Sequence, residues 1–450
     1  MKLNHVNHLY RRAGFGLTPK EAESMAVRSK EDVIDLLFKE SEDYTPLEMD
    51  LSPFTDFFRN NPNATYKQFK PIFEKNKELR VPLNKAWLKR ICDPTEALNE
   101  RMTLFWSNIF VCQDLIVPYV LQFNNTLRKH ALGNFKDMAK AVSKEPAMLR
   151  FLNTNRNKKN HPNENFAREL MELFTLGVGN YTEEDIKEAA RAFTGYTHYP
   201  DGKFRMILRN HDFGTKEFFG YKGNLDGDDI INIIAKKKEC ARFICSKVYS
   251  YFVHENIDEN RVEELVDVFY PNYEISDLMY YLFSAEWFYE KDNIGTKIKS
   301  PMDLLASIHK VVPFHFTEDK QHIFLQRLLG QVLFNPPNVA GWKGGKNWID
   351  TNTILVRLKL PSLLLGNGLI PFSGLSYTLD YIPFGNRLRV ESDWTYFNEH
   401  FGNLSAEAIA NALVSEVENN PESSLIETLN GKNREDFSIQ LMSTPEFQLT

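Results

Sequence analysis

Cysteine is scarce in this sequence: Cys92, Cys112, Cys240 and Cys245 are the four present among 450 residues. A fold held together by disulfides needs a far denser set, and a structural zinc site needs Cys or His pairs at short spacing. No two of these cysteines form a CxxC pair. We therefore expect buried free thiols, which pack as small apolar side chains.

Long apolar runs are also missing. No window approaches the roughly 20 apolar residues that a membrane-spanning helix needs. The first residues, MKLNHVNHLYRRAGFG, lack the apolar stretch of about 7–15 residues found in a secretory signal. The sequence thus predicts a chain with no membrane span, and the absence of a signal predicts a cytoplasmic location.

An excess of positive charge is missing as well. The chain has 54 Lys and Arg against 60 Asp and Glu, which gives a net charge of −6 and a pI near 6.1. Nucleic-acid-binding proteins usually carry a basic footprint, so no nucleic-acid partner is expected. The hydrophobic share of 42% and the 34 Phe residues are sufficient for an extensive core and exclude a disordered chain.

Strand signals are few, whereas helical periodicity recurs along the chain. The best strand signal is at 196–208, where Pro200-Asp201-Gly202 forms a turn between two β-rich runs. We predict a mostly α fold, a large multi-helix domain with a small β-hairpin. Residues 1–368 form the helical core, and the more polar residues 369–450 form a C-terminal extension packed on it. Helices are expected over 20–40, 95–132, 134–153, 163–176, 182–194, 228–253, 261–270, 276–290, 301–311 and 321–334.

The densest group of polar residues lies at 161–196. With about 100° per residue, an α-helix over 163–176 gathers polar side chains within an arc of about 140°, opposite an apolar face. These side chains are Glu164, Asn165, Arg168, Glu169 and Glu172. A second helix over 182–194 also carries a polar stripe, and the short connection makes the two antiparallel neighbours.

Two interpretations of these carboxylates remain open. Paired carboxylates can divide general acid and base roles, or they can ligate a hard cation from facing helices. Glu169 is followed at the third position by Glu172 rather than by His, which departs from the di-iron pattern. The alternative is a solvated face of ion pairs without a ligand.

Three further groups are candidates for binding or catalysis, each with a structural alternative. His211, Asp212 and Lys216 offer a base, an acid and a cation in one loop, but His-Asp in a loop also suits an Asx turn. Arg128 and His130 end an apolar-faced helix, where they bind an anion or stabilise the helix dipole. Trp342, in the loop 335–350 with Trp348, either contacts a ligand or anchors the loop to the core.

Familiar catalytic templates are absent. The sequence has no GxSxG elbow, P-loop or HExxH helix, and RRAGFG at 11–16 has too few glycines for a dinucleotide-binding fingerprint. The segment NLDGDDIINII at 224–234 fails the calcium-loop pattern, because Gly227 stands fourth and position twelve is Ala235. We predict instead that Asp226 and its neighbours cap the following helix.

Several segments together resemble one known family. They are RRAGFG, HALGNF, EPAMLRFL, NENFARELMELFTLGVGNYTEEDIKEAARAFTGY, HDFGTKEFFG, DGDDIINII and PPNVAGWKGG, in order between about His8 and Arg357. The chain is similar to the large bacterial family catalogued as domain of unknown function eighteen hundred. The resemblance implies a companion related to phosphatases and sulfatases, and export in many relatives. Where relatives often have Phe-Trp-His-Asn-His-Phe, this chain reads FWSNIF, so Ser107 and Ile109 replace two histidines.

Two hypotheses of different classes follow. In the first, the chain is a hydrolase-like or metal-assisted enzyme, with a divalent metal as candidate cofactor. Its predicted catalytic residues are Glu164, Glu169, Glu172, His211 and Asp212, and its predicted substrate-binding residues are Arg128, His130, Arg168, Lys216 and Trp342. In the second, the chain is a non-catalytic accessory of the phosphatase- or sulfatase-like companion, which it contacts through the Trp-containing loop and the C-terminal segment.

Overall fold

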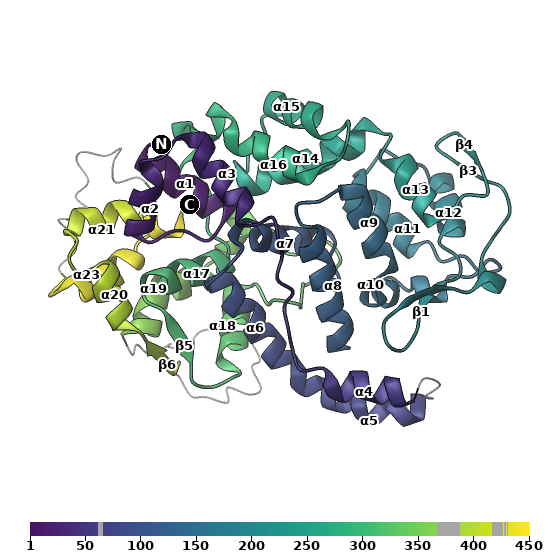
Figure 1. The fold of residues 1–450 in the computed structure, drawn as a ribbon, viewed down its shortest axis with the longest axis horizontal. Coiled ribbons are helices and arrows are strands. Elements are labelled where there is room, and N and C mark those ends of the chain that lie inside the picture. The colour runs from purple at the N-terminus through teal and green to yellow at the C-terminus, as the bar shows by residue number, and fades with distance from the viewer. Residues whose placement is uncertain (62–65, 367–387, 416–425, 427–428, 430) are drawn as a thin grey trace.

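The computed structural model describes residues 1–61, 66–366, 388–415, 426, 429 and 431–450. The described chain is mostly helical, which confirms the predicted fold class (Figure 1). Its first part consists of α1 (Leu3–Ala13), α2 (Pro19–Ala26), α3 (Lys30–Lys39), α4 (Ser52–Asn60), α5 (Tyr66–Asn76), α6 (Arg80–Cys92), α7 (Ala97–Ile109), α8 (Val117–His130), α9 (Phe135–Lys144) and α10 (Pro146–Phe151). Helices α4 and α5 project from the body as a hairpin.

The middle of the chain continues with helices and two small hairpins. Its elements are α11 (Asn165–Glu169), a π-helical segment (Leu170–Thr175), α12 (Glu183–Ala192), β1 (Tyr196–His198), β2 (Phe204–Met206), β3 (Lys216–Phe218), β4 (Tyr221–Gly223), α13 (Gly227–Ile234), α14 (Lys238–Phe252), α15 (Glu259–Phe269) and α16 (Ile275–Ser284). Strands β1 and β2 pair antiparallel with Thr197 opposite Arg205, which confirms the predicted hairpin. Strands β3 and β4 form a second hairpin, which was not predicted.

The last part of the chain packs around α17 (Pro301–Val311) and α18 (Gln321–Leu329). It contains β5 (Phe314–Phe316), α19 (Thr353–Leu365), β6 (Val390–Ser392), α20 (Trp394–His400), α21 (Ala406–Leu413) and α23 (Arg434–Met442). Strand β6 pairs with β5, and α23 packs on α19. The expected boundary between residues 368 and 369 lies outside the described residues, and the division there stays a prediction.

Side-chain caps explain where several helices begin. Thr182 and Asp185 form a reciprocal capping box at α12, and Asp226 and Asp229 form another at α13, which confirms the predicted cap at that position. The predicted helix over 95–132 is divided in two by residues 110–116. There the Asp114 carboxylate accepts a hydrogen bond from the Ile116 backbone N–H at 2.8 Å, which starts the turn that leads into α8.

Two clusters of buried side chains form the core. The first surrounds Trp106 and Phe135 and is built mainly by α1 and α7–α16. The second surrounds Trp87 and Phe397 and is built mainly by α6, α17–α21 and α23. Helix α7 lies between them, because Trp106 faces the first cluster and Leu104 the second.

All four cysteines are free, and Cys92, Cys240 and Cys245 are buried, as expected from the sequence. Over the residues that the structure describes, no helix combines the length and the apolar character needed to cross a membrane.

Candidate functional site

The polar block at 161–196 forms ion pairs rather than an open site. The Arg168 guanidinium donates two hydrogen bonds of 2.9 Å to the carboxylate of Glu183, the first residue of α12. It also contacts Glu164 Oε2 at 3.3 Å. The antiparallel helices α11 and α12 are thus joined by a solvent-exposed ion-pair network, the structural alternative that the sequence left open.

The angles that the helical wheel gives to residues after Glu169, including Glu172, do not apply in the structure. The chain enters a π-helical turn at Leu170, where the advance per residue is smaller than in an α-helix, so the arc drawn at 100° per residue no longer applies. Glu172 Oε2 accepts a hydrogen bond of 2.7 Å from the Tyr181 hydroxyl. Burial, together with nearby Glu172, raises the pKa of Glu169.

The loop that carries His211, Asp212 and Lys216 is held by its own polar groups. The buried His211 lies with Nδ1 2.8 Å from the Thr194 carbonyl oxygen. Asp212 accepts a 2.7 Å bond from Arg191 Nε and a 2.8 Å bond from the backbone N–H two residues on, which is the Asx turn considered above. The Arg191 bond lowers the pKa of Asp212. Lys216 is fully buried and donates to the Asp212 carbonyl oxygen at 2.5 Å.

Arg128 is part of a buried structural pair. Its Nε and Nη2 donate to the two carboxylate oxygens of Glu100 at 2.9 and 2.8 Å, and Trp87 Nε1 donates to the same carboxylate at 2.6 Å. Arg128 and Glu100 are almost completely shielded from solvent, with side-chain exposures of 1% and 2%. His130 ends α8, where burial and the neighbouring Lys129 lower its pKa.

The ten predicted site residues therefore do not converge. Of these, Trp342 lines the cavity described next, and the other nine lie elsewhere. Their predicted catalytic and binding roles stay predictions, but the geometry points to a different place. Within the described ranges, no three His, Cys, Asp or Glu side chains gather closely enough to hold a metal ion. Within those ranges, the metal-assisted form of the enzyme hypothesis therefore has no group of side chains that would ligate the metal.

A cavity of about 420 Å³ lies where α1, α7, α14 and the start of α17 meet the loop 335–350. Helix α7, which divides the two core clusters, provides one wall through Arg101, Phe105, Asn108 and Ile109. The charged and aromatic side chains that line the cavity are Arg11, Arg12, Arg101, Lys247, Lys297, Lys343, Glu255, Asp303, Phe105, Tyr251, Trp342 and Trp348.

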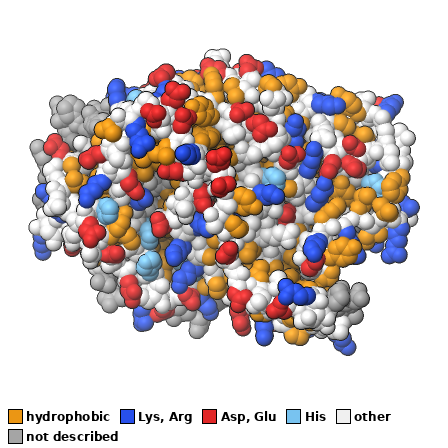
Figure 2. All heavy atoms as spheres, viewed as in Figure 1, with side chains coloured by type: hydrophobic (Ala, Val, Ile, Leu, Met, Phe, Trp, Pro, Cys, Tyr) orange, Lys and Arg blue, Asp and Glu red, His pale blue; other side chains and the backbone are white. Residues whose placement is uncertain are grey.

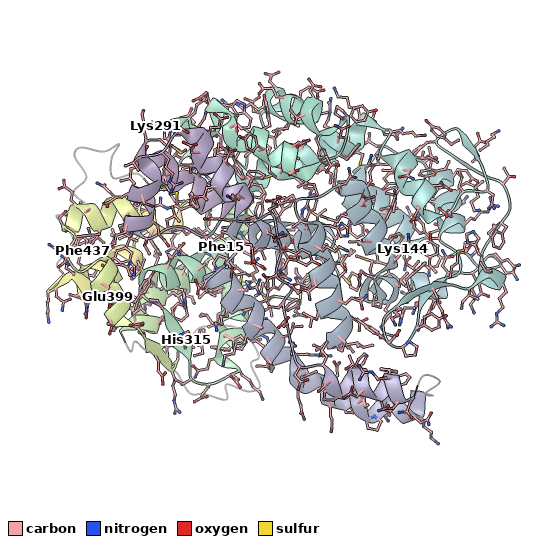
Figure 3. All side chains as sticks on the ribbon, in the orientation of Figure 1. Phe15, Lys144, Lys291, His315, Glu399 and Phe437 are labelled. Atoms are coloured by element: carbon pink, nitrogen blue, oxygen red, sulfur yellow. The ribbon has the colours of Figure 1, made fainter. Side chains whose placement is uncertain are left out.

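Arg101 forms the fixed wall of the cavity. Its guanidinium stacks 4.1 Å above the ring of Phe15, which lies near the middle of the view in Figure 3. Arg101 Nη1 contacts Asp303 Oδ1 at 2.5 Å and the Tyr251 hydroxyl at 3.3 Å, and Nε donates to the Gly14 carbonyl at 2.9 Å. Paired and stacked in this way, Arg101 has a preorganised orientation.

Arg12 lines the same cavity with part of its guanidinium unsatisfied. Nη2 donates to the Asn293 carbonyl oxygen at 2.9 Å and to a main-chain oxygen of Thr450, the last residue of the sequence, at 2.7 Å. Its Nε and Nη1 are buried and have no hydrogen-bond partner among the described residues. Burial lowers the pKa of Arg12 to about 9, although Asp303 acts in the opposite direction. Buried nitrogens without an acceptor are costly, and the positive charge of Arg12 adds to the potential of the cavity beside it.

Lys297 adds a group that titrates near neutral pH. Burial, reinforced by the positive charge of Arg12, lowers the pKa of Lys297 to about 7, while Glu255 opposes the shift. Its Nζ donates a short hydrogen bond to the Ser250 carbonyl oxygen on α14. A lysine in this environment can give up and regain a proton under physiological conditions.

The loop 335–350 closes the cavity by approaching its walls closely. Asn108 on α7 holds it through two bonds, accepting from the Trp342 backbone N–H at 2.7 Å and donating to the Trp342 carbonyl at 3.1 Å. Two glycines with positive φ make this possible. A Cβ on Gly341 would lie 2.3 Å from Asn108 Oδ1, and one on Gly345 would lie 2.1 Å from Glu255 Oε1. The two tryptophans are only 6% and 8% exposed.

Positive charge exceeds negative charge in this cavity. Six cationic and two acidic side chains line it, as does Thr450, the last residue of the sequence. Of the six cations, Arg101 alone is paired with an acidic side chain within the described part of the chain. The outer surface in Figure 2 is different, because acidic and basic side chains are interspersed on it. The cavity therefore favours an anionic guest although the chain as a whole is acidic.

Sequence reasoning missed most of this site. Arg11 and Arg12 were considered only within the segment RRAGFG, as part of a failed dinucleotide fingerprint and of the family resemblance, and Lys297 was not considered. The available signal was a pair of arginines at the end of a helix, followed by Ala13, Gly14 and Phe15. The site also includes one of the two positions at which the family resemblance contrasted this chain with histidine. Ile109 lines the cavity, whereas Ser107 donates to the Leu104 carbonyl at 2.8 Å.

Comparison with known proteins gives one match. A family model described as "Protein of unknown function (DUF1800)" matches residues 8–449, which is nearly the whole chain. No curated protein and no solved structure matches it.

Proposed function

We propose that this chain, which belongs to the family of unknown function DUF1800, binds a small molecule with a phosphate, sulfate or carboxylate group in the cavity between α1, α7 and α14. The observation that carries the proposal is the charge imbalance among the lining side chains, six cationic against two acidic. Arginine forks match the planar or tetrahedral oxygens of such groups and form strong charge-assisted hydrogen bonds with them.

Arg12 and Arg101 have different parts in this proposal. Arg101 is already paired with Asp303 and stacked on Phe15, so it shapes the wall and contributes positive potential. Arg12 has Nε and Nη1 buried and without partners, so its charge is not offset by an acidic side chain and adds to the attraction for an anion in the cavity. Lys297 adds a second contact when it is protonated.

The test is isothermal titration calorimetry of the full chain with sodium sulfate and with phosphate at pH 6.5 and low ionic strength. Saturable binding is expected, and the Arg12→Met variant should weaken it at least tenfold. Lys187→Met is the matched control, since Lys187 is an exposed lysine paired with Glu184 outside the cavity. Absence of heat with both anions, or equal affinity in Arg12→Met, would contradict the proposal.

The same cavity supports the hydrolase-like form of the function, with different residues from those predicted. In hydrolysis of an anionic ester, the oxygen of water attacks, the ester bond breaks, and a proton must reach the leaving oxygen. Lys297 is the proposed proton donor, and it regains its proton from the attacking water. With 4-nitrophenyl phosphate or 4-nitrophenyl sulfate as probe, Lys297→Met should abolish turnover but retain measurable binding.

An accessory role is the second candidate, and the cavity chemistry favours it too. A phosphatase- or sulfatase-like companion acts on the kind of anionic group that this cavity suits. The expected contact through the Trp-containing loop is not favoured, because Trp342 and Trp348 are buried and cannot anchor a partner. Co-purification of the companion with the native chain and with Arg12→Met would test the role. A companion that never co-purifies would contradict it.

A further inference from the structure

A second hollow, of about 670 Å³, lies beside the cavity on the same face of α14. Lys247 and Ser250 line both spaces, so the two are adjacent along successive turns of one helix. The loop after α14 also borders both spaces, since Glu255 lines the cavity and Ile257 lines the hollow. A single ligand can therefore occupy both.

The charge excess does not extend into the hollow. Of its cations, Arg242 contacts Glu263 Oε2 at 2.5 Å, and Lys238 pairs with Glu263 and, at 3.2 Å, with Asp267. Glu239 adds a further carboxylate to its lining. The local positive charge is largely neutralised there, and Lys247 marks the end of the unpaired cations that begin at Arg12.

The remaining lining of the hollow is neutral. Phe243 is partly buried, packs against Gly177 and lies with its ring centroid 5.3 Å from Lys247 Nζ. Ile257, which is 43% exposed, adds a large apolar side chain to the lining. Asn180 and Ser246 provide polar atoms without charge. Apolar walls with a few neutral polar groups are typical of a site for an uncharged organic body.

We infer that the ligand is an organic molecule with a single anionic head in the cavity and an uncharged body in the second hollow. Esters of phosphate or sulfate and organic carboxylic acids belong to this class, whereas inorganic anions and polyanions do not. The inference rests on the proposed function, because it assumes that the cavity takes the anionic head. It adds the size and polarity of the rest of the molecule.

The test compares three probes by calorimetry with the full chain in about 0.15 M salt, where weak long-range attraction is screened. The probes are orthophosphate, phenyl phosphate and tripolyphosphate. Burial of a phenyl ring in the hollow should make phenyl phosphate bind at least tenfold more tightly than orthophosphate. Tripolyphosphate should bind less tightly than phenyl phosphate, because Lys247, which the cavity shares, is the one cation in the described lining of the hollow without a carboxylate partner.

A variant pair locates the effect. Ile257→Asp places a carboxylate in the hollow at an exposed position, which keeps the risk of misfolding low. It should weaken phenyl phosphate at least fivefold and change orthophosphate affinity less than twofold. The matched control is Leu208→Asp, also at an exposed apolar residue but outside both spaces, and it should change neither affinity.

The possible failures are distinguishable. If none of the probes binds, the proposed function itself is wrong. If orthophosphate and phenyl phosphate bind equally, or if tripolyphosphate binds most tightly, the cavity binds anions but the inference about the second hollow is overturned. If Ile257→Asp weakens both orthophosphate and phenyl phosphate to the same extent, the hollow does not hold a separate part of the ligand, and the inference is again overturned.

Discussion

Two regions of the molecule contain similar side chains in opposite electrostatic states. One is the polar block formed by α11, α12 and the loop 210–216, and the other is the cavity between α1, α7 and α14. In the block, Arg168 and Arg191 each contact two carboxylates, and Lys216 is satisfied by backbone carbonyls. In the cavity, Arg12 has two nitrogens without a partner, and its hydrogen bonds go to main-chain oxygens of Asn293 and Thr450. Charged residues are numerous in both regions. In the block the arginines are paired with acidic side chains, and in the cavity most of the cations are not.

This difference shows why charged residues in a sequence are a poor guide to a site. A carboxylate and a guanidinium that face each other stabilise a fold and leave little for a ligand. A cation with no carboxylate beside it has an electrostatic requirement that the fold does not meet. The following predictions test whether pairing separates structural from functional charge in this chain.

The largest effect is expected at the buried pair of Arg128 and Glu100. Arg128→Met leaves the Glu100 carboxylate without its guanidinium in the core, which should lower the free energy of unfolding by about 3–5 kcal/mol. Urea denaturation followed by circular dichroism measures it. Sulfate affinity of the folded variant should be unchanged. A stable Arg128→Met protein that no longer binds sulfate would show that the paired cation, too, is functional.

The second-largest effect is expected at Arg12, where sulfate affinity rather than stability should be lost. Arg12→Met should weaken sulfate binding at least tenfold, which is about 1.4 kcal/mol of binding free energy. Its free energy of unfolding should fall by less than half of the Arg128→Met loss, because no carboxylate is left unpaired. Calorimetry and urea denaturation of the same two variants provide the comparison. Equal destabilisation of both would remove the distinction between the two regions.

Sulfate affinity should also depend on pH through Lys297, and this effect should be similar to or smaller than that of Arg12→Met. Its pKa of about 7 in the free protein rises when an anion is bound, because the anion favours the charged form. Sulfate affinity should therefore be constant below pH 7 and fall by up to about tenfold per pH unit above it. Sulfate itself does not titrate in this range. Calorimetry between pH 6 and 8 is the measurement, and Lys297→Met should have a flat profile there, because this range lies below the pKa of about 9 of Arg12.

The same depressed pKa affects stability with the opposite sign. The unfolded chain binds a proton at Lys297 up to a pKa near 10.5, whereas the anion-free folded chain loses it near 7. The contribution of this group to stability should therefore rise between about pH 7 and 10.5, and it is lost as the pH falls through 7. A thermal unfolding series in sulfate-free buffer, native against Lys297→Met, isolates it.

The smallest effect is expected at the exposed pairs of the polar block. Arg168→Gln should change the free energy of unfolding by less than about 1 kcal/mol, since its partners Glu164 and Glu183 are solvent-exposed. Glu169→Gln/Glu172→Gln should leave sulfate affinity and metal content unchanged, as measured by calorimetry and plasma mass spectrometry. If either is lost in the double variant, the carboxylates form the site that the sequence suggested.

The sequence was sufficient to predict the fold class, because helical periodicity, caps and turns are local properties. The Pro200-Asp201-Gly202 turn places the β1–β2 hairpin, and Asp226 caps α13 as expected. The π-helical turn at Leu170 could not be predicted in this way, since a helical wheel assumes a constant advance per residue. Because of that single assumption, the expected positions of Glu172 and its neighbours around the helix differ from those in the structure.

The cavity could not be predicted because it is made by contacts between distant segments. Arg12 and Lys297 are separated by 285 positions in the numbering, and their proximity depends on the packing of α1 against the segment before α17. The polar density at 161–196 was visible in the sequence, but the acceptors of Arg168 and Arg191 depend on how α11, α12 and the 210–216 loop meet. Pairing of charge is a tertiary property, and composition does not reveal it.

The position of the cavity beside α7 also has a consequence for how the chain unfolds. Phe105 and Ile109 belong to the first core cluster and Leu104 to the second, and all three line the cavity. An occupant of the cavity would contact both halves of the molecule and would lose its contacts if either half opened. Ligand binding should therefore increase cooperativity and merge separate melting events of the two halves into one transition.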